Sequence, residues 1–425
     1  MNRNVVALVA GLGMLVPAAA MAQEASVVEG KGVPMGEGTV LHPTAGAELG
    51  FTDNVFYQDL KRDRKASGIL RLLLEGALAS KDTSEDPGAA EAAGDDGEDS
   101  NAAPAMKFRA GGRLAYHEYL STNDFVQEQR TLSADFNGSL IVAPEGTFSF
   151  SADERFIRDT RPTNFESFDN TNRIANSLAL GLKYQPGGRT ISGGLRWENQ
   201  IDVFEAESQQ FANRMINTFH LRGEWMLFPY TKIYTDASYG FISGIGDSTQ
   251  RGATPIRGGA GIATALTELF TVKANLGWAH AGYDGGASYN QPLLGVEVGY
   301  RYSPVGRLVV AYQLDARDSI NADFYRDHAL RAQVDQQIRS IVATGLAEVR
   351  LRGYRGVIDD AMNAGTRDDL IFAAGVRAQY VMRDWLAIVA DWRTEVTTTD
   401  YRTPMTGDDP GFTRTEITAG VRAAF

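Results

Sequence analysis

Charged side chains recur at alternate positions along several stretches of the chain, for example at Arg196 and Glu198 and at Asp391 and Arg393. Residues two apart lie on the same face of a β-strand. Acids and bases on one face can pair between neighbouring strands and are tolerated where that face is wet. This chemistry suits the wall of a water-filled pore. The candidate pore-lining residues are Arg196, Glu198, Arg222, Glu224, Arg301, Asp315, Arg317, Glu348, Arg350, Arg352, Arg377, Asp391, Arg393 and Glu395.

The same alternation predicts a wall with as many bases as acids, and therefore a nearly neutral lumen. Such a wall suits a neutral or weakly charged polymer, because a strongly anionic one would need an excess of Arg and Lys. One candidate strand carries Glu348, Arg350 and Arg352, and another carries Asp391, Arg393 and Glu395. We expect these two groups to form one polar ladder along the wall.

Catalytic and metal-binding patterns are weak in this sequence. The five histidines are His42, His117, His220, His280 and His328, and no two have the spacing of a helical metal site. A G-x-S-x-G elbow, a P-loop and a dinucleotide fingerprint are all missing, and the absence of Cys excludes disulfides and thiolate ligands. The sequence therefore predicts no enzyme activity, no catalytic residue, no metal and no cofactor. Its net charge of −12 also argues against a nucleic-acid partner.

The N-terminus has the pattern of a secretory signal peptide over residues 1–22. Arg3 precedes an apolar run from Val5 to Ala20, and Ala20-Met21-Ala22 forms a small-x-small cleavage site. The alternative is an N-terminal membrane anchor, which the short run disfavours. No later stretch approaches the ~18 uncharged apolar residues of a transmembrane helix.

The elements that must position the charges are long amphipathic strands. From Ile191 to Val203, apolar side chains alternate with polar ones almost without exception. Such stretches exceed the roughly 5–6 residues of a sandwich strand and the ~9–11 residues that cross hydrocarbon. Short turns alternate with longer polar loops, a pattern typical of outer-membrane barrels. The expected strands are 40–53, 67–81, 106–121, 130–142, 147–160, 173–185, 189–204, 214–228, 231–244, 254–266, 269–283, 291–303, 307–318, 326–337, 341–355, 368–381, 385–398 and 412–425.

These segments predict an all-β fold, a closed antiparallel transmembrane β-barrel of about 18 strands. The weakest segment is 326–337, and 16 strands are the alternative if it fails. The barrel spans residues 39–425, follows an N-terminal periplasmic extension at 23–38, and has both termini in the periplasm. An insert at 83–105 is expected to be disordered, since Asp82 to Asp99 hold eight carboxylates and no base.

The C-terminus ends in Phe425, which shares a face with Val421 and Ile417. A terminal Phe on an amphipathic last strand resembles the signal that the barrel-assembly machinery reads in bacterial outer-membrane proteins. That resemblance implies the assembly machinery, outer-membrane lipid and lipopolysaccharide as partners. Aromatic residues near the short turns also fit an interfacial girdle; they are Tyr184, Phe228, Tyr230, Phe270, Tyr302, Tyr380, Trp385 and Phe425.

The first expected strand runs from Pro43 into Phe51, Asp53-Asn54-Val55 and Phe56. This segment resembles the opening of the putative β-barrel porin type 2 family. The resemblance implies a location in the Gram-negative cell outer membrane. Some family members are associated with exopolysaccharide secretion, which implies a periplasmic polysaccharide export protein as a further partner.

Together these features favour an outer-membrane channel for a large polar solute, with the resemblance pointing to export of a surface polysaccharide. A general diffusion porin is the first alternative, although it should have a long loop folded into the lumen and no expected loop is that long. A barrel enzyme with a Ser/His pair and a non-conducting structural barrel are the remaining alternatives.

Overall fold

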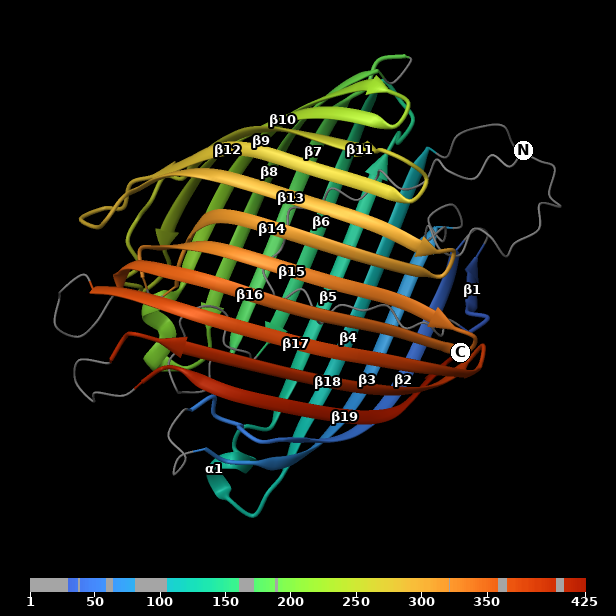
Figure 1. The fold of residues 1–425 in the computed structure, drawn as a ribbon, viewed down its shortest axis with the longest axis vertical. Coiled ribbons are helices and arrows are strands. Elements are labelled where there is room, and N and C mark those ends of the chain that lie inside the picture. The colour runs from blue at the N-terminus through green and yellow to red at the C-terminus, as the bar shows by residue number, and fades with distance from the viewer. Residues whose placement is uncertain are drawn as a thin grey trace.

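The computed structural model describes residues 30–36, 39–58, 64–80, 105–159, 172–187, 190–320, 322–357, 365–402 and 409–425. The predicted signal peptide, the first part of the N-terminal extension and nearly all of the acidic insert lie outside these residues. Within them, the chain is almost entirely β-sheet. Figure 1 shows strands β13 to β19 crossing in front of the strands that form the opposite wall.

Every expected strand is present, including the weak segment 326–337, which forms most of β15. The barrel strands in the described residues are β2 (Thr39–Thr52), β3 (Ser67–Ser80), β4 (Met106–Leu120), β5 (Thr131–Val142), β6 (Phe148–Asp159), β7 (Arg173–Tyr184), β8 (Ile191–Phe204), β9 (Arg214–Phe228), β10 (Thr231–Gly244), β11 (Ile256–Ala265), β12 (Phe270–Ala281), β13 (Tyr289–Ser303), β14 (Gly306–Asp318), β15 (Phe324–Ile338), β16 (Ile341–Val357), β17 (Gly365–Arg383), β18 (Leu386–Thr399) and β19 (Phe412–Ala424).

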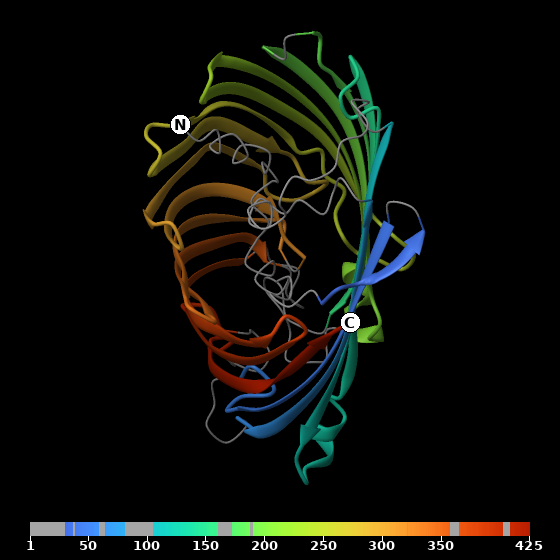
Figure 2. The same ribbon diagram turned by 90° about the vertical axis from the view of Figure 1, so that its right-hand side faces the viewer.

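The sheet closes on itself because the last strand pairs with the first barrel strand. β19 and β2 run antiparallel, with Gly420 opposite Glu48 and Arg422 opposite Gly46. Each of the other barrel strands pairs antiparallel with its neighbours in the sequence. Figure 2 looks towards one end of the barrel and shows the strands forming a ring. The fold is therefore a closed antiparallel barrel of 18 strands, as predicted.

A short strand precedes the barrel where the sequence suggested only an extension. β1 (Val33–Gly36) pairs antiparallel with the start of β2, with Val33 opposite Leu41. The segment has no readable alternation because it holds Pro34 and ends at Gly36. Proline is accepted here since β1 is a short edge strand that pairs on one side.

Alternation sets the two faces of the barrel wall. On β3, Leu72 and Leu74 are exposed, whereas Arg71 and Leu73, which alternate with them, are buried. The same is true of Leu49 and Glu48 on β2. Large apolar side chains on the outer face can be accommodated by hydrocarbon, and a closed ring satisfies the backbone hydrogen bonds that lipid cannot.

The described residues contain only short helices, α1 (Asp124–Gln127) and the 3-10 helix η3 (Glu207–Ala212). In the described part of the chain, no helix has both the length and the apolar character needed to span a bilayer.

The two ends of the barrel differ. At the turn end, tight connections such as those between β9 and β10 and between β18 and β17 join the strands, and Phe425 lies there. At the loop end, longer connections join β8 to β9, β10 to β11 and β12 to β13. The eight aromatic residues expected to form a girdle are all exposed, and most lie at strand ends beside the tight turns.

Candidate functional site

The candidate pore-lining residues occupy the strand face opposite the exposed apolar one. Contacts that skip strands show that this face looks into the barrel. Arg257 on β11 forms an ion pair with Asp315 on β14, passing over β12 and β13. Arg214 on β9 donates from Nη1 to the Ser319 carbonyl, 3.1 Å away beyond the end of β14. The inner wall of the barrel is therefore the candidate functional site, and the role of its residues in conduction stays a prediction.

The most tightly paired part of the wall spans β15 and β16. Glu348 accepts from Arg331, with Nη2 at 2.7 Å from Oε2, and also pairs with Arg350. Arg352 donates from Nε and Nη2 to the two oxygens of Asp327, each at 2.7 Å. Two parallel bonds between a guanidinium and a carboxylate fix the geometry of both groups. Arg350, Arg352 and Glu348 are all buried, so this part of the wall is held by mutual pairing.

Arg352 also packs against aromatic rings. Its guanidinium carbon lies 4.0 Å from the ring centroid of Tyr325 and 5.8 Å from that of Tyr354. A cation over an aromatic face is stabilised by the ring quadrupole, and more strongly when it is desolvated. Arg352 is therefore a structural residue of the wall, and a solute in the lumen has little access to it.

A second group of predicted residues is more open to the lumen. Arg196 on β8 pairs with Asp153 on β6, with 2.7 Å between Nη1 and Oδ2, and its side chain is 42% exposed. Glu198 accepts from the Ser177 hydroxyl at 3.2 Å. On β9, Glu224 accepts from Arg222 at 2.7 Å. Exposed pairs of this kind contribute little to stability, and they can exchange partners with a passing solute.

The remaining predicted residues form smaller groups. Asp315 and Arg317 are paired at 2.7 Å within β14. Arg377 on β17 pairs with Asp391 on β18 at 3.1 Å, and Arg393 lies 3.7 Å from Glu395. Arg301 is exposed near the turn end of β13.

The expected polar ladder between β16 and β18 is not continuous. Ala373 on β17 lies between them, opposite Glu348 on one side and Glu395 on the other. The methyl group of alanine cannot connect the two carboxylates. The two groups are therefore separate patches, and the prediction of one ladder was wrong.

The inner wall also carries charges that the sequence reasoning missed. They follow the same alternation, but their strands are interrupted by glycines or extend beyond the apolar band, so the pattern was harder to assign. The additional inner positions in the described strands are the bases Lys107, Arg173, Lys183, Arg214, Lys232, Arg257, Lys273, Arg307, Arg331 and Arg367 and the acids Asp159, Asp327, Asp335 and Asp369. Because bases outnumber acids among these, the prediction of a neutral wall needs correction: the described wall has a surplus of positive charge.

A buried ion-pair network lies where the barrel closes. Glu48 on β2 accepts from Arg71 on β3 at 3.0 Å and from Arg422 on β19 at 3.1 Å. Arg71 also pairs with Glu416 on β19 at 2.8 Å. Glu48 and Arg422 are only 3% and 2% exposed. These contacts tie β2, β3 and β19 together on the inner face.

One Ser/His contact exists on the inner wall, between His117 Nε2 and Ser133 Oγ at 3.2 Å. The Nε of Arg71 donates to His117 Nδ1 at 3.4 Å. A neutral imidazole that accepts at Nδ1 carries its proton on Nε2. In this arrangement His117 donates to Ser133 and offers no base to activate the hydroxyl. The contact is therefore a wall hydrogen bond, with the geometry of neither a nucleophile nor its base.

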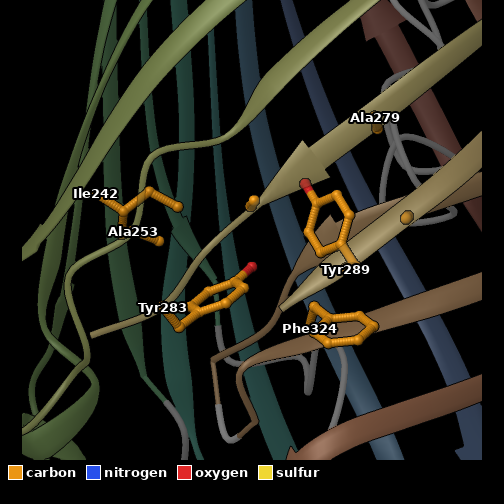
Figure 3. Close-up of a cluster of buried hydrophobic side chains, with 8 residues drawn as sticks. Ile242, Ala253, Ala279, Tyr283, Tyr289 and Phe324 are labelled. Atoms are coloured by element: carbon orange, nitrogen blue, oxygen red, sulfur yellow. The ribbon is translucent and has the colours of Figure 1, made fainter. Parts of the chain in front are cut away.

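The loop end holds a cluster of aromatic and small residues inside the barrel. Figure 3 shows Tyr283, Tyr289 and Phe324 grouped together, with Ile242 and Ala253 beside Tyr283. The ring centroids of Tyr289 and Phe324 are 5.0 Å apart, and those of Tyr283 and Phe324 are 6.2 Å apart. Burial raises the pKa of the Tyr283 phenol, and Asp318, which accepts its hydrogen bond, raises it further.

This cluster packs on inner positions of β9, β10, β12 and β13. The residues that hold those positions are Ile216, Ile242, Ala279 and Leu293. A cluster on the inner face of four strands reduces the open cross-section of the barrel at its loop end. No single long loop is needed for this, because several short connections contribute.

We call the connections that surround this cluster the loop cap. It comprises residues 245–255, residues 282–288, and Ser319, Ile320, Ala322 and Asp323 between β14 and β15.

Phe425, the predicted assembly signal, follows β19 and is exposed. Its backbone N–H donates to the Pro43 carbonyl at 3.0 Å. The terminal residue is therefore held beside β2, with its ring on the surface. Recognition by an assembly factor stays a prediction.

No family model and no curated protein matches the chain. Among solved structures it is similar to OpdQ of Pseudomonas aeruginosa, at 9% identity and a TM-score of 0.47, over 91% of this chain and 98% of that one. It is similar to the outer membrane protein OpdK of the same organism at 7% identity and a TM-score of 0.47, over 91% and 99%. The siderophore receptor PirA of Pseudomonas aeruginosa is similar at 7% identity and a TM-score of 0.39, over 91% and 80%. Similarities at this level carry no information on function.

The architecture itself is informative. A closed antiparallel barrel with an apolar outer face and a polar inner face is characteristic of the outer membrane of Gram-negative bacteria. This chain has that architecture, and its location in the outer membrane follows from it.

Proposed function

We propose that this protein is a porin-like channel that lets a polar solute cross the outer membrane passively. The observation that supports this most strongly is the contrast between the two faces of the closed wall. Leu72 and Leu74 are exposed on the outside, while Arg71 and Glu75 on the same strand face the interior and pair there. A barrel of ~18 strands is wide enough for an aqueous lumen. Ionised side chains on the inner face are stable only if that lumen is polar.

The turn end is proposed to face the periplasm and the loop end the outside. Both Gly30 and Phe425 lie at the turn end, where Gly30 donates to the Asp384 carbonyl at 3.3 Å. Short periplasmic turns and longer external loops are the usual arrangement of such barrels. The barrel-assembly machinery, lipopolysaccharide and a periplasmic polysaccharide export protein remain proposed partners.

The finer proposal is that the solute is a surface polysaccharide. It rests on the sequence resemblance at Pro43–Phe56 and on an inner wall rich in groups that can replace water around sugar hydroxyls. Arg196 and Asp153, which are partly exposed, are examples. Because the described wall carries a surplus of bases, we propose a polymer with few negative charges, in place of a strictly neutral one.

A general diffusion porin is the second candidate, and the loop cap favours it. A cluster that narrows the loop end hinders a polymer more than it hinders a small sugar. The sequence disfavoured a diffusion porin because no expected loop was long enough to narrow the lumen. Several short loops that pack together can narrow it instead, and this supports the diffusion porin.

Liposome swelling with the refolded protein tests both candidates. Neutral sugars of increasing length should enter vesicles that contain the protein, and the length at which entry stops gives the exclusion limit. Entry of long oligosaccharides would support the polymer channel, and a limit at di- or trisaccharides would support the diffusion porin. Vesicles that swell with none of the sugars, together with silent planar bilayers, would refute a channel of either kind.

A further inference from the structure

Asp323 connects loops that come from four different parts of the barrel. Its Oδ1 and Oδ2 accept from Arg251 Nη1 at 2.8 and 3.0 Å, which ties in the β10–β11 loop. Oδ2 also accepts from the Ala287 backbone at 2.8 Å, in the β12–β13 loop. Its own N–H donates to the carbonyls of Arg355 and Gly356, each at 3.1 Å, at the end of β16.

Two glycines leave room for this carboxylate. A Cβ placed on Gly356 would lie 2.0 Å from Asp323 Oδ2, and one on Gly286 would lie 2.7 Å from the same atom. Gly356 also has a φ of +67°, which a side chain would disfavour. Both glycines therefore fit the position of the Asp323 side chain closely.

The residues just before Asp323 contact strands further round the mouth of the barrel. Ile320 is fully buried against Phe204 of β8 and Ala212 of η3. The Ser319 carbonyl accepts from Arg214 of β9 at 3.1 Å, and Arg214 is itself paired with Asp202 at 2.9 Å. Because β14 and β9 are separated by four strands, this connection spans part of the loop end of the lumen.

We propose that the loop cap is the size-selecting constriction of the channel and that Asp323 is the positioning residue that holds it in place. The inference rests on the proposed channel function and adds to it the element that sets the exclusion limit. Neutral and weakly charged sugars must pass beside the cap, so their length and width decide their rate. Asp323 itself is almost fully buried and does not contact the solute.

Removing the carboxylate should release the loops that it connects. In D323A, the β10–β11 loop loses its bonds from Arg251 and the β12–β13 loop loses its bond from Ala287. We expect the single-channel conductance roughly to double, because the open cross-section at a constriction limits the current. The exclusion limit for neutral sugars should rise as well. D323N keeps a side-chain oxygen that can accept from Ala287, so it should stay close to the wild type.

A matched control is available at the same end of the barrel. Asp409 pairs with Arg402 at 2.6 Å and accepts from the Gly411 backbone at 2.8 Å, both within the β18–β19 loop. D409A also removes a loop carboxylate from an Arg pair, and it should leave conductance and exclusion limit unchanged. R251A removes one contact of Asp323 from a partly exposed partner. It tests the same element with less risk to folding and should give a smaller increase.

The absence of Cys from the chain permits a direct lock. In an A212C/I320C variant, a disulfide would join the β14–β15 connection to η3, where the native side chains already pack. Combined with D323A, the oxidised lock holds the β14–β15 connection alone, so conductance should fall part of the way to the wild-type level, and a reductant should restore the increase. A locked protein with the high conductance of D323A would contradict the proposal.

The outcomes separate the two proposals. If the wild type conducts and D323A and R251A match it in conductance and exclusion limit, the cap does not set the size limit and the inference is overturned. If the wild type and all variants are silent, the channel function fails and the inference fails with it. A silent wild type with a conducting D323A would show that the cap closes the channel completely, and would overturn its assignment as a size-selecting constriction.

Discussion

Asn54 donates from Nδ2 to the Thr413 carbonyl at 2.8 Å, although the two residues are 359 positions apart in the chain. Asn54 is fully buried, and its side chain also bonds to both backbone groups of Gln58. Asp53 beside it accepts from the Thr415 backbone at 2.7 Å. The segment that carries the family resemblance therefore fastens the β2–β3 connection to the last strand.

We expect N54A to destabilise the barrel because it leaves the Gln58 and Thr413 carbonyls without this donor. Each buried group left without a partner costs roughly 1–3 kcal/mol. The measurement is the urea midpoint of the refolded protein, followed by the loss of the compact band on unboiled gels. N137A removes an amide from the partly exposed inner wall and should have little effect. Equal midpoints for N54A and the wild type would contradict this role.

The contributions of Glu48 and Arg422 to the stability of the barrel should depend strongly on each other. E48Q removes the close charged partner of the buried Arg422 guanidinium, which keeps only the longer contact with Glu75 at 3.8 Å, while Arg71 keeps Glu416. Breaking a buried pair on one side costs about 3–5 kcal/mol. The double variant E48Q/R422Q should be less destabilised than E48Q, because it leaves no uncompensated charge.

E395Q is the control for that experiment. Glu395 is partly exposed and lies 3.7 Å from Arg393, a pair that contributes about 0–1 kcal/mol. Chemical unfolding of the four proteins under one condition gives the comparison. A double variant that is less stable than E48Q would show that the two side chains act independently.

Ion selectivity should follow the surplus of bases on the inner wall. We expect a modest preference for anions in reversal-potential measurements under a salt gradient. R196Q/K273Q should reduce it, because both side chains face the lumen and are partly exposed. R326Q neutralises an outward-facing exposed base and should not change it. Cation preference in the wild type would mean that the charges on the described wall do not control permeation.

Deletion of Phe425 should impair assembly more than stability. The ring is exposed, and its loss from the membrane interface removes roughly 1–3 kcal/mol of burial, too little to unfold the barrel. We expect reduced amounts in the outer membrane in cells but a near-normal unfolding midpoint after refolding in detergent. F425Y, which keeps an aromatic ring, should assemble normally. Wild-type levels of the deletion variant in the outer membrane would argue against an assembly signal.

The strands could be predicted from the sequence because hydrocarbon and water impose a strict alternation on the two faces of the wall. The hardest segment, 326–337, shows where the rule weakens. Arg326 faces outward but lies at the loop end, where it donates to Gln291 at 3.3 Å. There the strand extends past the apolar band, so an outward charge is not penalised.

The loop cap could not be predicted in the same way. Ile320 is buried by Phe204 and Ala212, more than a hundred residues earlier in the chain. In the sequence it appears as one apolar residue in a polar connection, with nothing to identify its partners. The ion pairs within the wall could not be predicted either. Alternation gives the face on which Glu348 lies, but it does not show that Arg331 and Arg350 are its partners.

The position of Glu48 has a consequence for the order of events during biosynthesis. Arg71 lies directly opposite Glu48 on β3 and follows it by 23 residues in the chain, but Arg422 follows it by 374 residues. Until β19 pairs with β2, one edge of β2 is unpaired, and the Glu48 carboxylate has Arg71 but lacks Arg422. An incomplete ring in lipid would expose the unpaired edge of β2 and the Glu48 carboxylate to hydrocarbon. Strand-by-strand insertion into bare lipid is therefore unfavourable, because β2 is fully paired only once β19 has been synthesised.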